Sequence, residues 1–150
     1  MGESKNIEYF SQNDNKHKSI KILIQALLSV LAIASYPALF LYFQNADEAR
    51  FSEIALPLFV FITIGTILYT ITYIVVKSTS KAAIISNLFI FVLLNYSLLE
   101  NGIVKIFPTL RYWHVFPIFV YIIFHFAGFI YKKFSEEISN TTVIVLSIVF

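Results

Sequence analysis

The chain has 150 residues, of which 58% are hydrophobic and 13% are charged, and its formal net charge is +2. Its mean hydropathy of +0.77 lies outside the range of soluble globular domains. So small a positive charge gives no support to nucleic-acid binding. The absence of cysteine excludes disulfides, thiolate metal sites and cysteine nucleophiles. The composition therefore predicts a membrane protein.

Residues 1–21 precede the first long apolar run and include the polar stretch SQNDNKHKS. They show almost no apolar periodicity, so we predict a short flexible cytoplasmic tail without a fold of its own. Lysines before the apolar run, followed by Ala32-Ile33-Ala34, imitate a cleaved secretory signal. The run continues to Phe43, however, whereas a cleaved signal gives way to polar sequence. We therefore expect an uncleaved first helix.

Four apolar runs, 22–43, 54–76, 82–99 and 113–131, contain no Asp, Glu, Lys or Arg. About 20 apolar residues in a helix cross a hydrocarbon core of about 30 Å. Each charge at a helix centre costs about 2.5 to 3.5 kcal/mol, so charge-free runs of this length indicate membrane spans. The expected fold class is all-α, with a polytopic transmembrane helical bundle of four full spans occupying residues 22–150.

Basic residues are distributed unequally between the two sides of the membrane that these spans define. Eight lie on the side of the N-terminal tail and three lie on the other side. The eight are Lys5, Lys16, Lys18, Lys21, Lys77, Lys81, Lys132 and Lys133, and the three are Arg50, Lys105 and Arg111. Basic residues in short loops are retained in the cytoplasm. We therefore predict a multi-pass protein of the cell membrane with a cytoplasmic N-terminus.

The last ten residues, TTVIVLSIVF from 141 to 150, become apolar again after the predicted cytoplasmic surface. As a helix they rise about 15 Å, half the hydrocarbon thickness, which leaves a terminal charge near the bilayer centre. We therefore expect the first part of a fifth span, with Ser139 or Asn140 as its N-cap, in a chain that is a fragment of a longer protein. The alternative is a terminal strand or helix lying at the membrane surface.

Five polar residues inside the spans are candidates for chemistry within the membrane: Gln25, Asn87, Asn95, His114 and His125. Asn87 and Asn95 are eight residues apart and lie near one helix face, where amides bond a neighbouring helix or line a polar path. The histidines are about 16 Å apart along their helix, so they cannot share a metal ion. We expect His114 at the outer interface and His125 in an interhelical hydrogen bond.

Prolines and aromatic residues mark the predicted helices and their ends. Pro37 lies deep in the first span and should kink it, whereas Pro57 and Pro117 fall in first turns, where proline is tolerated. Aromatic residues occupy the predicted interfaces, as an aromatic belt requires. They are Tyr42, Phe43, Tyr112, Trp113 and Tyr131. These aromatic residues set the depth of the helices, and we assign them no ligand role.

The charged residues of the two outer loops offer the one place for a site, as a polar collar above the helices. They are Asp47, Glu48, Arg50, Glu53, Glu100, Lys105, Arg111 and His114. Their spacing specifies no nucleophile or acid–base pair, so a solvated rim or a docking surface is the favoured interpretation over an active site. The chain also lacks a phosphate-binding loop, a zinc-protease motif and a serine elbow. We assign no catalytic, cofactor-binding or metal-binding residue.

The stretch from Tyr36 to Lys133 contains the phrases YPALFLYFQNADEARFSEIALPLFVFI, KSTSKAAIISNLFIFVLLNYS and RYWHVFPIFVYIIF. It resembles the N-terminal membrane region of bacterial sulfatase-like hydrolase/transferases of the alkaline phosphatase superfamily, the lipoteichoic-acid-synthase and phosphoethanolamine-transferase type. The resemblance implies that a helical bundle precedes an extracytoplasmic catalytic domain, which holds the nucleophile and the metal ligands. On this reading the chain is the anchor and not the catalyst.

These observations favour a membrane anchor that positions an extracytoplasmic sulfatase-like or phosphoglycol-transferring enzyme of the cell envelope. Its expected partners are membrane lipids and its own extracytoplasmic C-terminal domain. Two alternatives stay open. A small transporter or flippase component is favoured if Asn87, Asn95 and the Pro37 kink line a common polar cavity. The other alternative is an interaction subunit without chemistry, whose outer loops dock a partner.

Overall fold

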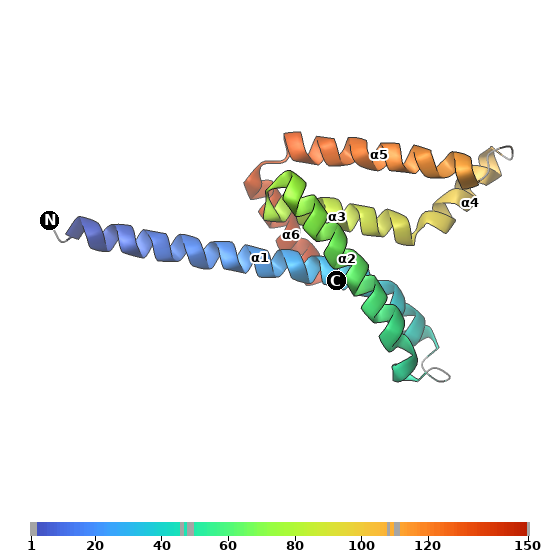
Figure 1. Ribbon diagram of the computed structural model, residues 1–150, viewed down its shortest axis with the longest axis horizontal. Helices are drawn as coiled ribbons and strands as arrows, with labels where there is room; N and C mark the ends of the chain where they lie inside the picture. The colour runs from blue at the N-terminus through green and yellow to red at the C-terminus, as the bar shows by residue number, and fades with distance from the viewer. Residues whose placement is uncertain (1–2, 46, 48–49, 108, 110–111, 150) are drawn as a thin grey trace.

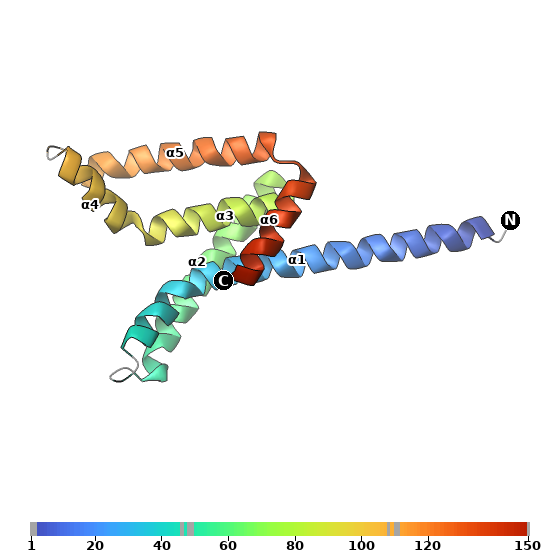
Figure 2. The ribbon, with the colours of Figure 1, turned by 180° about the vertical axis from the view of Figure 1, so that it is seen from behind.

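The computed structural model describes residues 3–45, 47, 50–107, 109 and 112–149. These residues form helices and connecting segments and contain no strand, which confirms the predicted all-α fold class. The helices are α1 (Glu3–Gln44), α2 (Phe51–Val76), α3 (Thr79–Leu94), α4 (Tyr96–Ile106), α5 (Tyr112–Lys133) and α6 (Glu136–Val149). Figure 1 shows their arrangement, and Figure 2 shows the same bundle from behind.

Three helical segments are long and apolar enough to cross a membrane: Lys16–Gln44 of α1, the whole of α2, and Trp113–Lys133 of α5. Helices α3 and α4 pass the same test only as a pair, and they are bent by 58° where they meet. The described residues therefore supply three membrane-length helices, or four if the bent pair is one span. The apolar run 82–99 is divided between two helices and is not the straight span that the sequence predicts.

The break between α3 and α4 lies at Asn95, whose backbone angles are φ −100° and ψ 10°. Its side-chain Nδ2 donates a hydrogen bond of 2.8 Å to the carbonyl oxygen of Phe91. The backbone N–H of Asn95 donates to the same oxygen at 3.1 Å. A short amide side chain competes for backbone groups in this way and disfavours a helix interior. An uncharged apolar run is therefore not sufficient to keep this helix continuous.

Helix α1 has 42 residues and begins at Glu3, so the segment predicted as a tail without a fold is helical from that residue. Neither proline nor glycine interrupts the chain between residue 3 and Pro37, which lies inside the helix. In Figures 1 and 2 the first half of α1 projects beyond the other helices. Its last turns change direction in both views, which agrees with the kink predicted at Pro37.

The core of the bundle lies where α1, α2, α3 and α6 meet. Helix α1 packs against α2, α3 and α6, and α3 also contacts α5, which runs beside it in the opposite direction (Figure 2). The core residues are Ala26, Val30, Ile33, Ala34, Tyr69, Ala82, Ala83, Ile90 and Val143. Most large apolar side chains of α2 and α5 lie outside this core and are exposed. That exposure is the surface expected of helices that face lipid.

Helices α1 and α2 approach each other closely at Gly65 of α2. A Cβ atom at Gly65 would lie 2.9 Å from the Cβ of Ala34 on α1 and 3.5 Å from Ile90 on α3. Small residues at a contact let helix backbones approach closely, which is how helices associate in a membrane. Gly65 therefore allows α1, α2 and α3 to pack around one point.

Helix α6 begins at Glu136, four residues before Asn140, so the N-cap predicted at Ser139 or Asn140 is wrong. Ser135 takes that place, because its Oγ accepts a hydrogen bond of 3.2 Å from the backbone N–H of Ile138. Glu136 and Glu137 occupy the first turn, where negative charge favours the helix dipole. The apolar run from 141 puts the start of this helix too late in the chain, because a helix can begin with charged residues at an interface. Pro57 lies in the second turn of α2 for the same reason, because that helix begins at Phe51 with Glu53 in its first turn. Pro117 is the sixth residue of α5 and also lies in a second turn, so neither proline is in the predicted first turn.

Candidate functional site

The first candidate is Asn87 of α3, which is 4% exposed at the interface with α1. Its Nδ2 donates a hydrogen bond of 3.2 Å to Oγ of Ser29, which in turn donates to the carbonyl oxygen of Ala26 at 2.9 Å. The Oδ1 atom of Asn87 has no partner. Asn87 therefore forms the contact with a neighbouring helix that the sequence suggests. Because it is buried between α1 and α3, it does not open onto a polar path.

The other polar residues of the spans do not gather into a site. His125 is exposed on α5, and its ring centroid lies 4.7 Å from that of Tyr121 on the same helix, so the predicted interhelical hydrogen bond is replaced by a contact within α5. His114 is exposed near the start of α5, and Gln25 is partly buried on α1. Within the described residues, no group of three or more His, Cys, Asp or Glu is placed to hold a metal ion.

The predicted outer collar is divided between two places. Arg50 and Glu53 lie at the start of α2, whereas Glu100 and Lys105 lie on α4. Figures 1 and 2 show the first turns of α2 and the whole of α4 on the same side of the bundle but well apart from each other. Glu48 and Arg111 are outside the described residues. The described charges therefore form two separate rims and not one ring that could converge on a substrate.

A polar network on the opposite side of the bundle from these two rims joins the start of α3 to the first two turns of α6. Oγ of Ser80 donates a short hydrogen bond to Oδ1 of Asn140. Oγ of Ser78 donates to Oε2 of Glu136 at 3.1 Å and also accepts from the backbone N–H of Lys81 at 3.4 Å, which caps α3. Nζ of Lys81 lies 3.9 Å from Oε1 of Glu136. We call these five residues the α3–α6 latch.

Burial decides which parts of the α3–α6 latch hold the helices together. Ser80 is 1% exposed, so losing its partner would leave a hydroxyl unsatisfied in the core. The side chain of Glu136 is 62% exposed, and an ion pair in that setting contributes less than about 1 kcal/mol. Sequence reasoning missed this latch. The available signal was the spacing of small residues, Ser80, Ala83 and Ser86 with Asn87, which is typical of a helix interface in a membrane.

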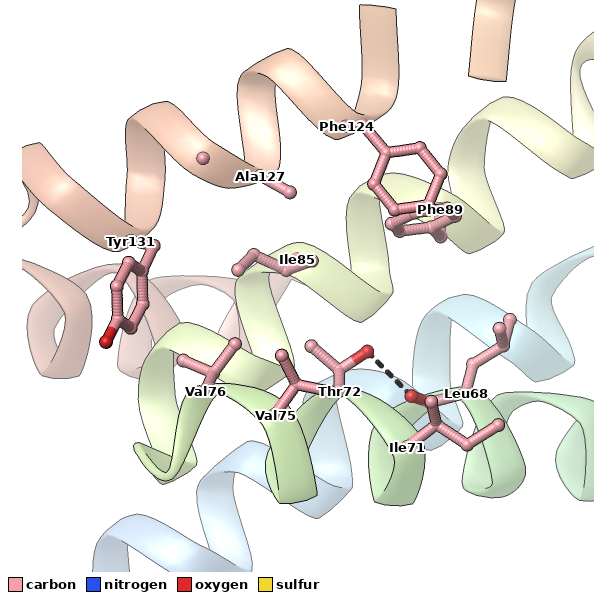
Figure 3. Close-up of a pocket in the computed structure, with 11 residues that line it drawn as sticks. Leu68, Ile71, Thr72, Val75, Val76, Ile85, Phe89, Phe124, Ala127 and Tyr131 are labelled. Atoms are coloured by element: carbon pink, nitrogen blue, oxygen red, sulfur yellow. Dashed lines mark hydrogen bonds between the residues drawn. The ribbon is translucent and has the colours of Figure 1, made fainter. Parts of the chain in front are cut away.

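An elongated apolar cavity of about 640 Å³ lies between α2, α3 and α5. Figure 3 shows Phe89 of α3 and Phe124 of α5 side by side at one end, with ring centroids 5.9 Å apart. Tyr131 of α5 and Val76 of α2 lie at the other end (Figure 3). Thr72 also lines the cavity, but its hydroxyl donates to the carbonyl oxygen of Leu68 at 2.7 Å. The walls are therefore suited to a hydrocarbon chain.

A second cavity, of about 550 Å³, lies between the kinked end of α1 and the end of α3. Pro37 and Asn95 line it together, along with aromatic and aliphatic side chains that include Tyr36 and Phe91. Asn87 does not line it. Pro37 and Asn95, two of the three residues whose shared cavity would favour a transporter, thus line one space. The third residue, Asn87, is buried in the core.

Comparisons with protein-family models, with curated proteins and with solved structures found no match to this chain.

Proposed function

We infer that the chain is the membrane-anchoring unit of an extracytoplasmic sulfatase-like or phosphoglycol-transferring enzyme and positions its catalytic domain at the membrane surface. The observation that carries this inference is the fixed packing of the bundle. Buried polar contacts join α3 to α1 through Asn87 and to α6 through Ser80. The close approach at Gly65 joins α2 to α1. A bundle whose helices are held in this way suits an anchor, which must keep an attached domain at one height and orientation.

The resemblance of the stretch from Tyr36 to Lys133 to the membrane region of such enzymes supports the same function. The predicted orientation also supports it, because a cytoplasmic N-terminus puts α4 and the start of α2 on the side where the catalytic domain would act. The separate charged rims on α2 and α4 then serve as contact points for that domain and not as a site of catalysis.

Replacing residues 22–149 with a cleaved secretory signal, in the protein that carries the proposed catalytic domain, tests the anchor. We expect that domain to move from the membrane to the soluble envelope fraction, and phosphoglycol transfer from a labelled phospholipid to fall; both should return with the unaltered protein. A photo-crosslinking residue at Gly102, which is exposed on α4, should capture that domain, and one at the exposed Lys133 should not. Membrane-bound activity that persists unchanged after this replacement would contradict the anchoring function.

The second cavity favours a small transporter or flippase component as the second candidate function, because Pro37 and Asn95 line one space. Kinked or irregular backbone at membrane depth occurs where it is buried in protein or lines a cavity, and Pro37 lines this one. The purified chain in vesicles with a fluorescent phospholipid tests this function. Lipid exchange between leaflets that stops in an Asn95→Leu variant would support it, and no exchange above that of empty vesicles would exclude it.

A further inference from the structure

The cavity between α2, α3 and α5 has the volume and the apolar walls of a ligand pocket. Its volume of about 640 Å³ falls within the roughly 300–1,000 Å³ of ligand pockets. Ile71, Val75 and Ile85 line it, and the hydroxyl of Thr72 is already bonded within its own helix. An apolar cavity of this kind does not hold water. In a membrane, the apolar material at hand to fill it is a lipid acyl chain.

The two ends of the cavity differ in chemistry. Phe89 and Phe124 close one end in an edge-to-face contact. At the other end, Val76 is followed by Lys77, and Tyr131 is followed by Lys132 and Lys133; all three lysines are exposed. An apolar slot with cationic residues at one end has the same distribution of polarity as a phospholipid with an anionic headgroup.

The charges around this end are not all positive, so their balance matters. Lys81 lies at the same end, with Nζ 5.7 Å from the ring centroid of Tyr131 and 3.3 Å from the carbonyl oxygen of that residue. Glu136 pairs with Lys81, and Glu137 is exposed nearby in α6. Four lysines thus face two glutamates, and the partial negative charge at the C-terminal ends of α2 and α5 reduces this excess of positive charge without cancelling it. The balance stays positive and complements an anionic group.

We propose that this cavity binds one phospholipid with an anionic headgroup, with an acyl chain between α2, α3 and α5 and the phosphate near Lys77 and Lys132. The site does not depend on the anchoring function, because it uses only residues of the bundle. The predicted orientation puts the headgroup in the cytoplasmic leaflet, where anionic lipids and basic juxtamembrane residues attract each other.

The test uses the whole chain in nanodiscs of phosphatidylcholine that contain phosphatidylglycerol with a photoactivatable acyl chain. We expect labelled peptides from 68–76 and 124–131, and much weaker labelling by the matching phosphatidylcholine probe. Gly128 lines the cavity, and a Cβ there would meet no atom within 4 Å. The Cβ of Gly128→Leu therefore has room, and the rest of the side chain should fill part of the cavity and lower the labelling by about tenfold, the effect of 1.4 kcal/mol of lost binding.

Matched variants separate lipid binding from a general effect on the bundle. Gly102 on α4 also faces open space, so Gly102→Leu should leave the labelling unchanged. Ala127→Val is the second filling variant if Gly128→Leu does not fold. Lys77→Gln together with Lys132→Gln should abolish the preference for phosphatidylglycerol, whereas Lys105→Gln should not.

Three results would overturn the proposal. One is labelling of these peptides that Gly128→Leu does not reduce. Another is equal labelling by the phosphatidylcholine and phosphatidylglycerol probes. The third is cross-linking of 68–76 or 124–131 to a second copy of the chain or to another protein in place of lipid.

Discussion

Asn87 of α3 and Ser29 of α1 join the two central helices through a hydrogen bond of 3.2 Å between Nδ2 and Oγ. Ser29 is fully buried, and Asn87 already has an unpartnered Oδ1. Hydrogen bonds between membrane helices average about 0.6 kcal/mol and reach about 1.7 kcal/mol. We expect Ser29→Ala to lower the free energy of unfolding in detergent micelles by an amount in this range.

The control for this prediction is Thr70 of α2, which is exposed and donates to the carbonyl oxygen of Thr66 in its own helix. Thr70→Val removes a hydroxyl without removing a contact between helices. An equal loss of stability in the two variants would mean that the bond between Asn87 and Ser29 makes no separate contribution.

A second prediction concerns Gly65 and Ala34, because a Cβ at Gly65 would lie 2.9 Å from the Cβ of Ala34. Neither atom is at the end of a flexible side chain, so α1 and α2 must move apart. Overpacking of this kind costs about 1–3 kcal/mol. We expect Gly65→Ala to lower the unfolding free energy by this amount, whereas Gly102→Ala, in open space on α4, should leave it equal or raise it by about 0.5–1 kcal/mol.

A rescue experiment distinguishes the clash from a general intolerance of Gly65→Ala. Ala34→Gly removes the opposing methyl group, so the double variant should be more stable than the sum of the two single changes predicts. A coupling of at least about 0.5 kcal/mol in the double-mutant cycle is expected for residues in contact. Strict additivity would show that the two positions do not meet.

The sequence predicts the membrane-length helices well because their signal is local. A charge-free run such as 54–76 has one low-energy arrangement in a bilayer, and the structure places it within α2. The same rule fails for 82–99, because composition does not show that the amide of Asn95 would bond the carbonyl of Phe91 and interrupt the helix. Local backbone competition of this kind depends on geometry and not on hydropathy.

Contacts between helices were harder to predict than the helices themselves. The sequence predicts that the amide of Asn87 bonds a neighbouring helix, but its partner Ser29 carries no distinguishing signal beyond its small size. The same prediction for His125 is wrong, because His125 is exposed and contacts Tyr121 of its own helix. Which face of α5 turns toward the bundle is decided by packing against α3, and one sequence does not contain that information in a local pattern. The cavity beside Gly128 also depends on how α5 packs against α3, so a local sequence pattern does not predict it.

The α3–α6 latch leads to a prediction about local opening. Asn140→Leu removes the acceptor for Ser80, which is buried, and an unsatisfied buried hydroxyl costs about 1–3 kcal/mol. We expect amides of α6 to exchange with deuterium about tenfold faster in this variant, because local opening of α6 becomes easier by about 1.4 kcal/mol.

Two neighbouring substitutions serve as controls for the latch. Thr141 is exposed and donates to the carbonyl oxygen of Glu137 within α6, so Thr141→Val should leave the exchange of α6 unchanged. Glu136→Gln weakens only an exposed ion pair and a hydrogen bond at the surface, and should change stability by about 0.5 kcal/mol or less. If Glu136→Gln opened α6 more than Asn140→Leu, the ion pair and not the buried hydroxyl would hold the helix.

The predicted orientation can be checked with single cysteines, since the chain has none of its own. Cysteines at Asp47 and Gly102 should react with an impermeant maleimide in intact cells, because both positions are exposed and lie on the predicted outer side. A cysteine at Ser78 should react only after the membrane is permeabilised. The bend of 58° between α3 and α4 makes Gly102 the informative position. If the bent pair crosses the membrane, Gly102 is labelled together with Asp47; if the pair is re-entrant, Gly102 is protected together with Ser78. Labelling of Ser78 alone in intact cells would reverse the orientation and would contradict the anchoring function that depends on it.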